Sequence, residues 1–364
     1  MYRRDLLKGL ALTGASALLS SCAGKRVRAS IPALSCMPRV NVSADRVIRT
    51  ICGLRPFRPS GFVIRAEKFG ETTVVHNYGH GGAGITLAWG TSRLALDLGL
   101  PGHTGPVAVL GAGVVGLSTA RLLQESGFPV TIYTKELPPN TTSNIGGGWW
   151  MPVMVADHEF RTAAFNDQLA KASAYSFQRY QIMVGPRYGV RWTRSYNLNN
   201  EGFVAGRQEL PESRDLQPGE HPFPGYKFVR QFDTLLIEPP IYLPAMLNDF
   251  YVAGGHIEVR EIRDVAAVSQ LPQKLVFNCT GLGAKTIFND SELMPIKGQL
   301  TFLLPQSEVE HSVIPDDLYM FSRHDGVILG GTHERGNWSL DVDTAIRDRI
   351  LARHKQFFDG MRSC

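Results

Sequence analysis

The chain has 364 residues, of which 43% are hydrophobic and 20% charged, so it is long enough to bury a sizeable core. Its 38 Lys and Arg residues outnumber 33 Asp and Glu residues, and the formal net charge of +5 is too small to indicate a nucleic-acid partner. The five cysteines lack the spacing of a metal site or a disulfide framework. We therefore predict neither a metal site nor a disulfide.

The first 21 residues form a predicted export signal. Arg3 and Arg4 are typical of a twin-arginine signal, and the apolar stretch after them, Leu10 to Leu19, is too short to span a bilayer. A Leu-Ser-Ser-Cys sequence ending at Cys22 indicates a lipoprotein cleavage site. We expect twin-arginine export, a lipidated Cys22, a tether over 22–41 and a periplasmic or cell-surface protein anchored to the membrane. The alternative is an ordinary cleaved signal followed by an incidental cysteine.

The first predicted strand runs from about Val42 to Thr50. The first glycine-rich loop comes later in the chain, over 74–84. The spacing of apolar residues after this loop predicts an amphipathic helix over Ile85–Leu98, whose N-terminus can stabilise negative charge. His76 and His80 are four residues apart, as in zinc-binding helices, but the glycines around them indicate a loop. We interpret both as loop histidines.

A second glycine-rich loop has the form of a dinucleotide fingerprint. It lies between a predicted strand, Val107–Leu110, and a helix that runs to about Ser126, and another strand, Val130–Tyr133, follows. In such a βαβ unit Gly111 permits the tight turn, Gly113 lets the backbone approach a pyrophosphate, and Gly116 lets helix and strand pack closely. The free N–H groups of the helix N-terminus then face the phosphates.

An acidic residue about twenty positions after the fingerprint holds the adenosine ribose in such units. Glu136 lies twenty positions after Gly116, although Lys135 precedes it. We therefore predict dinucleotide binding with Glu136 at the ribose. The alternative is a Rossmann-like unit that has lost its ligand.

The remaining chain gives weaker signals. Helical periodicity is present around Phe165–Tyr180, and a strand is predicted at Leu235–Glu238. The polar run Asn197–Asn200 and the proline-rich run His221–Gly225 predict a loop over the substrate site. A final helix is expected from about Asp341 to Phe358.

Five stretches of the chain resemble the FAD-dependent D-amino-acid oxidases, a family that includes the D-aspartate oxidases. These stretches are Gly111–Ala120; Thr141–Pro152; Asn278–Gly281; Gly330–Ser339; and Gly53–Pro59 together with His76–Gly82. In the family the segments that correspond to Gly53–Pro59 and His76–Gly82 close the chain, whereas here they open it. The chain therefore resembles a circular permutant, with the family's C-terminal piece joined to its N-terminal strand through 99–106.

This resemblance implies an α/β fold in which a Rossmann-like FAD-binding domain is interleaved with an α+β substrate domain built on a mixed sheet. The expected FAD-binding domain is 72–150 with 42–54 and 247–290. The expected substrate domain is 151–246 with 55–71 and 291–340. Residues 341–364 would form the C-terminal helix.

The resemblance also implies roles for individual residues. Arg55 would bind the substrate carboxylate with two parallel hydrogen bonds, which suits a planar guanidinium. The carbonyl of Gly82 would accept from the substrate amine, and the hydroxyl of Tyr226 would donate to the carboxylate. Phe228 and Val153 replace family residues that carry hydroxyl groups, and this changes the expected shape of the pocket. A structural ion pair is the better interpretation of Arg58.

FAD is the implied cofactor, and its predicted contacts come from the two glycine-rich loops and from three further segments. The predicted contacts are Gly111, Ala112, Gly113, Val114, Val115, Gly116 and Glu136; Thr141, Thr142, Ser143, Gly147, Gly148 and Trp149; Thr280 and Gly281; and His80, Gly81, Gly82, Ala83, Gly84, Ile85 and Thr86.

The implied reaction is oxidation of a D-amino acid by hydride transfer to flavin N5, giving a 2-oxo acid and ammonium. The acceptor would be dioxygen, with hydrogen peroxide as product, or a quinone. Arg230 or His221 could bind an acidic side chain, so D-aspartate and D-glutamate are alternative substrates. An alternative of another class is a flavin-bearing lipoprotein that binds amino acids without converting them.

Overall fold

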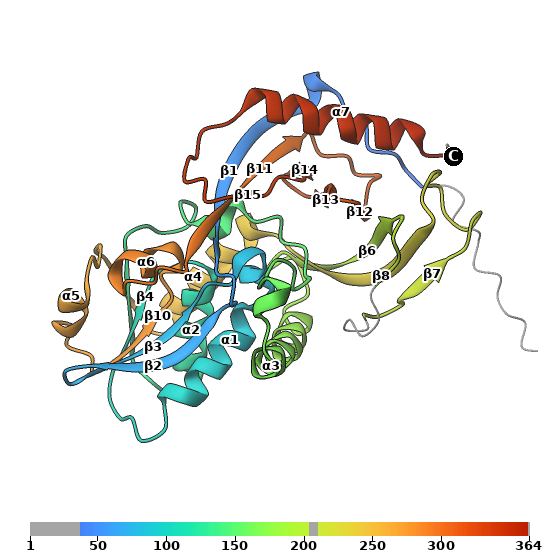
Figure 1. Cartoon of the computed structure of the whole chain (residues 1–364). Helices are drawn as coiled ribbons and strands as arrows, with labels where there is room; N and C mark the ends of the chain where they lie inside the picture. Colours follow the sequence, from blue (N-terminus) through green and yellow to red (C-terminus); the bar gives the residue numbers. More distant parts are fainter. Residues whose placement is uncertain (1–36, 204–209, 363–364) are drawn as a thin grey trace, which may run out of the picture. The chain divides into compact units, whose positions relative to one another are not determined.

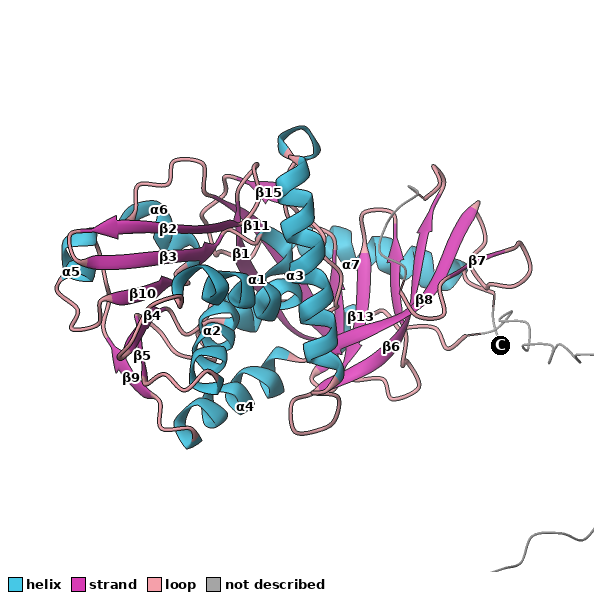
Figure 2. Ribbon diagram, turned by 90° about the horizontal axis from the view of Figure 1, so that it is seen from below, coloured by secondary structure: helices cyan, strands magenta, loops and turns pink. Residues whose placement is uncertain are grey.

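Six strands form a sheet around the dinucleotide fingerprint, in the order β2-β3-β10-β4-β5-β9 (Figure 2). Five of them are parallel, and β2 adds an antiparallel edge. The strands are β2 (Val63–Phe69), β3 (Thr72–Tyr78), β4 (Val107–Leu110), β5 (Val130–Thr134), β9 (His256–Val259) and β10 (Leu275–Asn278). The computed structural model describes residues 37–203 and 210–362, so the predicted signal and Cys22 lie outside the described residues.

Helices cover both faces of this sheet, and for this reason every residue of β4 is buried. Val107 and Val109 pack among the residues of the long helices, whereas Ala108 and Leu110 pack against the short helices on the other face. The long helices are α1 (Gly84–Gly99), α2 (Val114–Glu125), α3 (Ala163–Gln181) and α4 (Pro239–Val252); the short ones are α5 (Val265–Ser269) and α6 (Ala284–Ile287). No described helix is long and apolar enough to cross a membrane.

A second, nine-stranded sheet is mixed, because β6 and β12 are parallel whereas its other pairs are antiparallel. Its order is β1-β11-β14-β13-β12-β6-β8-β7, with β15 paired to β11. The strands are β1 (Val47–Phe57), β6 (Val190–Asn199), β7 (Arg214–Leu216), β8 (Phe228–Ile237), β11 (Met294–Leu303), β12 (Ser312–Pro315), β13 (Tyr319–Arg323), β14 (Gly326–Gly330) and β15 (Glu334–Arg335).

Helix α7 (Thr344–Gly360) lies across one face of the larger sheet (Figure 1). The side chain of Asp343 accepts hydrogen bonds from the N–H groups of Ala345 and Ile346, and it thereby caps the first turn. Ile350 and Phe358 of the helix pack in one apolar cluster with residues of β11, β13 and β14.

The elements around the fingerprint confirm the sequence prediction to within a few residues. β4, α2 and β5 form the expected βαβ unit, and α1 begins directly after the first glycine-rich loop. Helices α3 and α7 cover the predicted segments at Phe165–Tyr180 and Asp341–Phe358. The fold class predicted from the sequence, α/β with a mixed second sheet, is confirmed.

Three local predictions were wrong. The first strand begins at Val47 and continues to Phe57, because its place at the sheet edge tolerates the proline at 56. Asn197–Asn199 belongs to β6, where pairing with β8 overrides the turn preference of asparagine. The end of the predicted tether is buried, since Met37 and Val40 are 5% and 3% exposed and pack against the larger sheet.

Two short segments also pair differently from the predicted domain division. β1 contains most of 42–54 but pairs with β11 in the nine-stranded sheet. β2, within 55–71, pairs with β3 in the six-stranded sheet. The chain therefore crosses between the sheets in the loop between Phe57 and Val63. The segment before this loop, Gly53–Phe57, contains Arg55 and lies in the larger sheet.

Candidate active site

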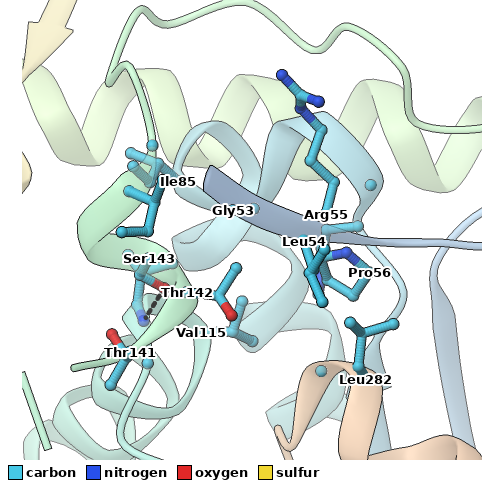
Figure 3. A pocket seen from close by; sticks show the side chains of 18 of the residues that line it. Gly53, Leu54, Arg55, Pro56, Ile85, Val115, Thr141, Thr142, Ser143 and Leu282 are labelled. Atoms are coloured by element: carbon cyan, nitrogen blue, oxygen red, sulfur yellow. Dashed lines mark hydrogen bonds between the residues drawn. The ribbon is translucent and has the colours of Figure 1, made fainter. Parts of the chain in front are cut away.

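A cavity of about 710 Å3 extends from the fingerprint to β1 and β13. This volume lies within the range of about 300–1,000 Å3 that is common for small-molecule and cofactor sites. Its lining combines the two glycine-rich loops with the β1 segment that carries Arg55. Figure 3 shows Gly53 to Pro56 of that segment together with Val115 of the fingerprint and Ile85, which follows the first loop. The fold thus brings together motifs that are far apart in the chain.

The fingerprint end of the cavity is shaped by glycines that no larger residue could replace. Gly111 has φ +97°, and a Cβ there would lie 2.8 Å from the carbonyl oxygen of Cys279. A Cβ on Gly116 would lie 1.9 Å from the carbonyl oxygen of Gly111, so α2 packs directly on the turn. The hydroxyl of Ser143 accepts a hydrogen bond from the N–H of Val114, at 3.0 Å. The resulting cradle at the N-terminus of α2 fits a pyrophosphate.

The far end of the cavity has the features of an adenosine site. Glu136 lines it and is exposed. Lys135, its neighbour, forms a salt bridge with Glu261 at 3.6 Å, and this pairing offsets the positive charge beside Glu136. The Arg260 guanidinium lies 4.8 Å from the centre of the Tyr133 ring, which closes this end.

The first glycine-rich loop lines the middle of the cavity and leads into α1. Gly81 has φ +58°, and a Cβ there would lie 2.1 Å from the carbonyl oxygen of Met154. Gly84, the first residue of α1, also lines the cavity, so the positive end of the helix dipole lies beside it. The neighbouring His80 is buried against Thr91, at 2.9 Å, and burial lowers the pKa of its imidazole to about 3. His80 is therefore neutral.

Arg55 projects from β1 on the side away from Ser143 and Thr142 (Figure 3). Its Nη1 donates to the carbonyl oxygen of Thr332 and its Nη2 to the hydroxyl of Tyr319, both at 3.2 Å. Gly298 on β11 leaves room for the guanidinium, because a Cβ there would lie 2.4 Å from Nη1. Within residues 37–203 and 210–362, no carboxylate pairs with Arg55.

The second arginine of the segment is structural, as the sequence predicted. Arg58 donates from Nε to Asp290 at 2.8 Å and from Nη2 to Glu292 at 2.5 Å. Both acceptors lie on the segment that leads into β11. Arg58 therefore has its charge satisfied within the protein, whereas the Arg55 charge is held by two neutral acceptors and can bind an anionic ligand.

Known proteins that are similar to this chain in sequence and fold include enzymes that bind FAD, as the cavity suggests. The chain matches the family of FAD dependent oxidoreductases over 25–98 and 106–363. The chain belongs to this family. A D-amino acid oxidase of Dugesia ryukyuensis is 28% identical over 71% of this chain and 79% of its own length. The D-aspartate oxidase of Homo sapiens is 29% identical over 69% and 75%. The glycine oxidase structure of Geobacillus kaustophilus shares the fold with a TM-score of 0.53, at 16% identity over 71% and 80%.

FAD is the cofactor of the family, and the residues present fit it. Most of the residues predicted to contact FAD line the cavity. Ala83 and Gly116 do not line the cavity. Ala83 packs in an apolar cluster with Phe62 and Leu87, and Gly116 faces the turn at Gly111. The cavity residues that would hold FAD are Gly111 to Val115, Glu136, Thr141 to Ser143, Gly147 to Trp149, Thr280, Gly281, His80 to Gly82 and Gly84 to Thr86.

The structure does not place Tyr226 where the resemblance implied. Tyr226 is absent from the cavity lining, and its hydroxyl donates to Asp316 at 3.0 Å. Tyr319 is instead the tyrosine whose hydroxyl lies beside Arg55. The difference arises because the segment before β8 folds towards α7, where Tyr226 packs against Phe357.

Tyr319 and His333 are among the cavity residues that sequence reasoning missed. Tyr319 begins β13, and His333 follows the Gly330-Gly331 pair. His333 is exposed, but desolvation by the residues packed around it, and then the positive charge of Arg55, lower the pKa of its imidazole to about 4. Its imidazole is therefore neutral at pH 7. Tyr319 lies outside the five stretches that resemble the family, and His333 lies within Gly330–Ser339 but was given no role there.

Proposed function

We propose that this protein is an FAD-dependent D-amino acid oxidase that converts its substrate to a 2-oxo acid and ammonium, with dioxygen as acceptor and hydrogen peroxide as product. The observation that supports the proposal most strongly is the Arg55 guanidinium. It lines the cavity that would hold FAD, and both protein groups that accept its hydrogen bonds are neutral. An amino acid carboxylate is the ligand that a free guanidinium binds best at such a site.

Arg55 would hold the substrate carboxylate, and the Gly82 carbonyl would accept from the amine. FAD, when bound, supplies the acceptor for the hydride that leaves the substrate Cα. With two substituents fixed, only one enantiomer presents its Cα hydrogen in the required direction, so catalysis rests on orientation. The first residues of α1 would stabilise negative charge on the cofactor ring. Water then hydrolyses the imino acid product, which releases ammonium.

The test is product analysis with a panel of D- and L-amino acids. The D enantiomers should give equimolar 2-oxo acid and hydrogen peroxide in air, whereas the L enantiomers should give neither. If a quinone analogue under argon supports faster turnover than air does, the chain is a dehydrogenase and the acceptor part of the proposal is wrong. Production of 2-oxo acid from L enantiomers alone would refute the substrate assignment.

The family order of the chain is the second part of the proposal, in which about residues 42–98 correspond to the family's C-terminal piece. Two observations support it. Met37, Val40 and Val42 pack in the same apolar cluster as Phe358 and Met361, so the two ends of the described chain lie together. The loop between α1 and β4 is largely exposed, as a tolerated junction should be.

Moving residues 42–98 to follow residue 360 through a short flexible linker should therefore give a folded protein that binds FAD. Arg55 and α1 act through their positions in space, and doubling a flexible loop costs only about 0.6 kcal/mol when its ends are near one another. Circular dichroism and the flavin content of the purified protein would measure the outcome. Flavin-free or insoluble protein at every linker length would contradict the permuted order.

We also propose that the protein is exported by the twin-arginine route and anchored at Cys22, as the sequence indicates. A route that carries folded proteins suits an enzyme that acquires FAD before export. Changing Cys22→Ala should move the protein from the membrane fraction to the soluble fraction and spare its activity. Fractionation of cells followed by immunoblotting tests this, and a variant that stays with the membranes would exclude Cys22 as the anchor.

A further inference from the structure

The turn between β12 and β13 carries two carboxylates at the Arg55 end of the cavity. Asp316 and Asp317 both line the cavity and are exposed. The backbone of Asp317 lies beside Gly331, where a Cβ would be 2.9 Å from its carbonyl oxygen. Gly331 directly precedes Thr332, whose carbonyl accepts from Arg55. The acidic turn therefore adjoins the proposed carboxylate site.

The charges of this turn are not balanced within the described structure. Arg353 of α7 pairs with both oxygens of Asp317, one of them at 2.8 Å, and this interaction lowers the pKa of that carboxyl group. Among residues 37–203 and 210–362, only the neutral hydroxyl of Tyr226 donates a hydrogen bond to the Asp316 carboxylate. Two carboxylates and one guanidinium leave one net negative charge, and the neighbouring His333 is neutral at pH 7.

Apart from Arg55, the lysine and arginine residues that line the cavity lie away from this turn. Lys135 and Arg260 line the cavity at its adenosine end. Arg230 is held by both oxygens of Asp215, at 2.6 and 2.9 Å, and does not line the cavity. His221 is buried, and its ring packs against Phe223. Once Arg55 binds the substrate carboxylate, an acidic side chain would face the charge of Asp316.

We infer that the site prefers D-amino acids with a cationic side chain, of the arginine and lysine type, and that Asp316 is the residue that selects them. This inference rests on the proposed function. Ile314 and Leu318, on either side of the turn, line the cavity and offer apolar surface to the methylene groups of such a side chain. Tyr226 acts as a positioning residue, because its hydroxyl fixes the Asp316 carboxylate.

The test compares kcat/KM for D-arginine with kcat/KM for D-norleucine, a neutral substrate with a similar stem, and for D-glutamate. The native enzyme should rank them in that order. Asp316→Asn should lower the ratio of D-arginine to D-norleucine about three- to tenfold, in line with a partly solvated ion pair. Asparagine also tolerates the left-handed backbone of this position, φ 54°, so the variant should fold. Higher ionic strength should reduce the ratio in the native enzyme.

Arg353→Gln should increase the ratio of D-arginine to D-norleucine, because it removes a positive charge and so makes the turn more negative, from one net negative charge to two. Asp348→Asn, on the exposed part of α7, removes the same charge as Asp316→Asn and should leave the ratio within about twofold. A ratio that Asp316→Asn does not change, or a native preference for D-glutamate, would overturn the inference while leaving D-amino acid oxidation intact. Absence of turnover with every D-amino acid would instead overturn the proposed function.

Discussion

Arg55→Leu should yield a protein that keeps its flavin and loses most of its activity. We expect kcat/KM to fall roughly 30- to 5,000-fold, which corresponds to about 2–5 kcal/mol for removing one member of a buried charge pair. Flavin should be retained because the Arg55 side chain projects away from Ser143, whose hydroxyl lies at the fingerprint cradle (Figure 3). Steady-state kinetics together with the flavin absorbance of the purified variant would measure both effects.

Arg55→Lys is the matched variant, because it keeps the charge and loses the planar fork. It should retain more activity than Arg55→Leu and less than the native enzyme. The second arginine gives a contrasting case, since Arg58→Leu removes two ion pairs of the fold and should lower stability rather than substrate binding. An unchanged kcat/KM in Arg55→Leu would mean that the substrate carboxylate binds elsewhere.

Gly116→Ala should destabilise the protein and weaken FAD binding. The added methyl group would lie 1.9 Å from the carbonyl oxygen of Gly111, and a backbone atom cannot move aside as a flexible side chain can. Overpacking of this kind costs about 1–3 kcal/mol or more. For a protein of this size it should lower Tm by roughly 1–4 °C. Thermal unfolding with and without added FAD, and an FAD titration, would test this.

Gly360→Ala provides the control, because no atom lies within 4 Å of a Cβ at that position near the end of α7. Its Tm and FAD affinity should match those of the native protein. If Gly116→Ala also behaves like the native protein, α2 does not pack on the Gly111 turn as closely as described, and the cradle at its N-terminus would need another explanation.

The fingerprint could be predicted from the sequence because its physics is local. Strand β4, the turn at Gly111 and helix α2 depend on a continuous apolar run, on glycine conformation and on helical periodicity within about twenty consecutive residues. A structural ion pair was also predicted for Arg58, but its partners Asp290 and Glu292, 232 and 234 residues away in the chain, were not. The family resemblance added FAD and the role of Arg55, which composition and periodicity do not give.

The rest of the site depends on long-range pairing that no local pattern encodes. Tyr319 contacts Arg55 across 264 residues of sequence, and the contact exists only because β1, β11, β14 and β13 are neighbours in one sheet. Tyr226 was predicted from its position before β8, but the loop that carries it folds towards Asp316 and α7. The position of a residue in the chain, relative to the next strand, does not indicate the direction in which the loop that carries it turns.

The most direct test of the central claim is an anaerobic titration of the purified yellow holoprotein with a D-amino acid and, separately, with its L enantiomer. The account predicts that the D enantiomer bleaches the flavin absorbance near stoichiometrically, while the L enantiomer leaves the spectrum oxidised. A protein that binds amino acids without converting them would shift the spectrum without bleaching it. Bleaching by the L enantiomer alone, or by neither enantiomer over a panel of side chains, would contradict the assignment of the Arg55 cavity as a D-amino acid oxidation site.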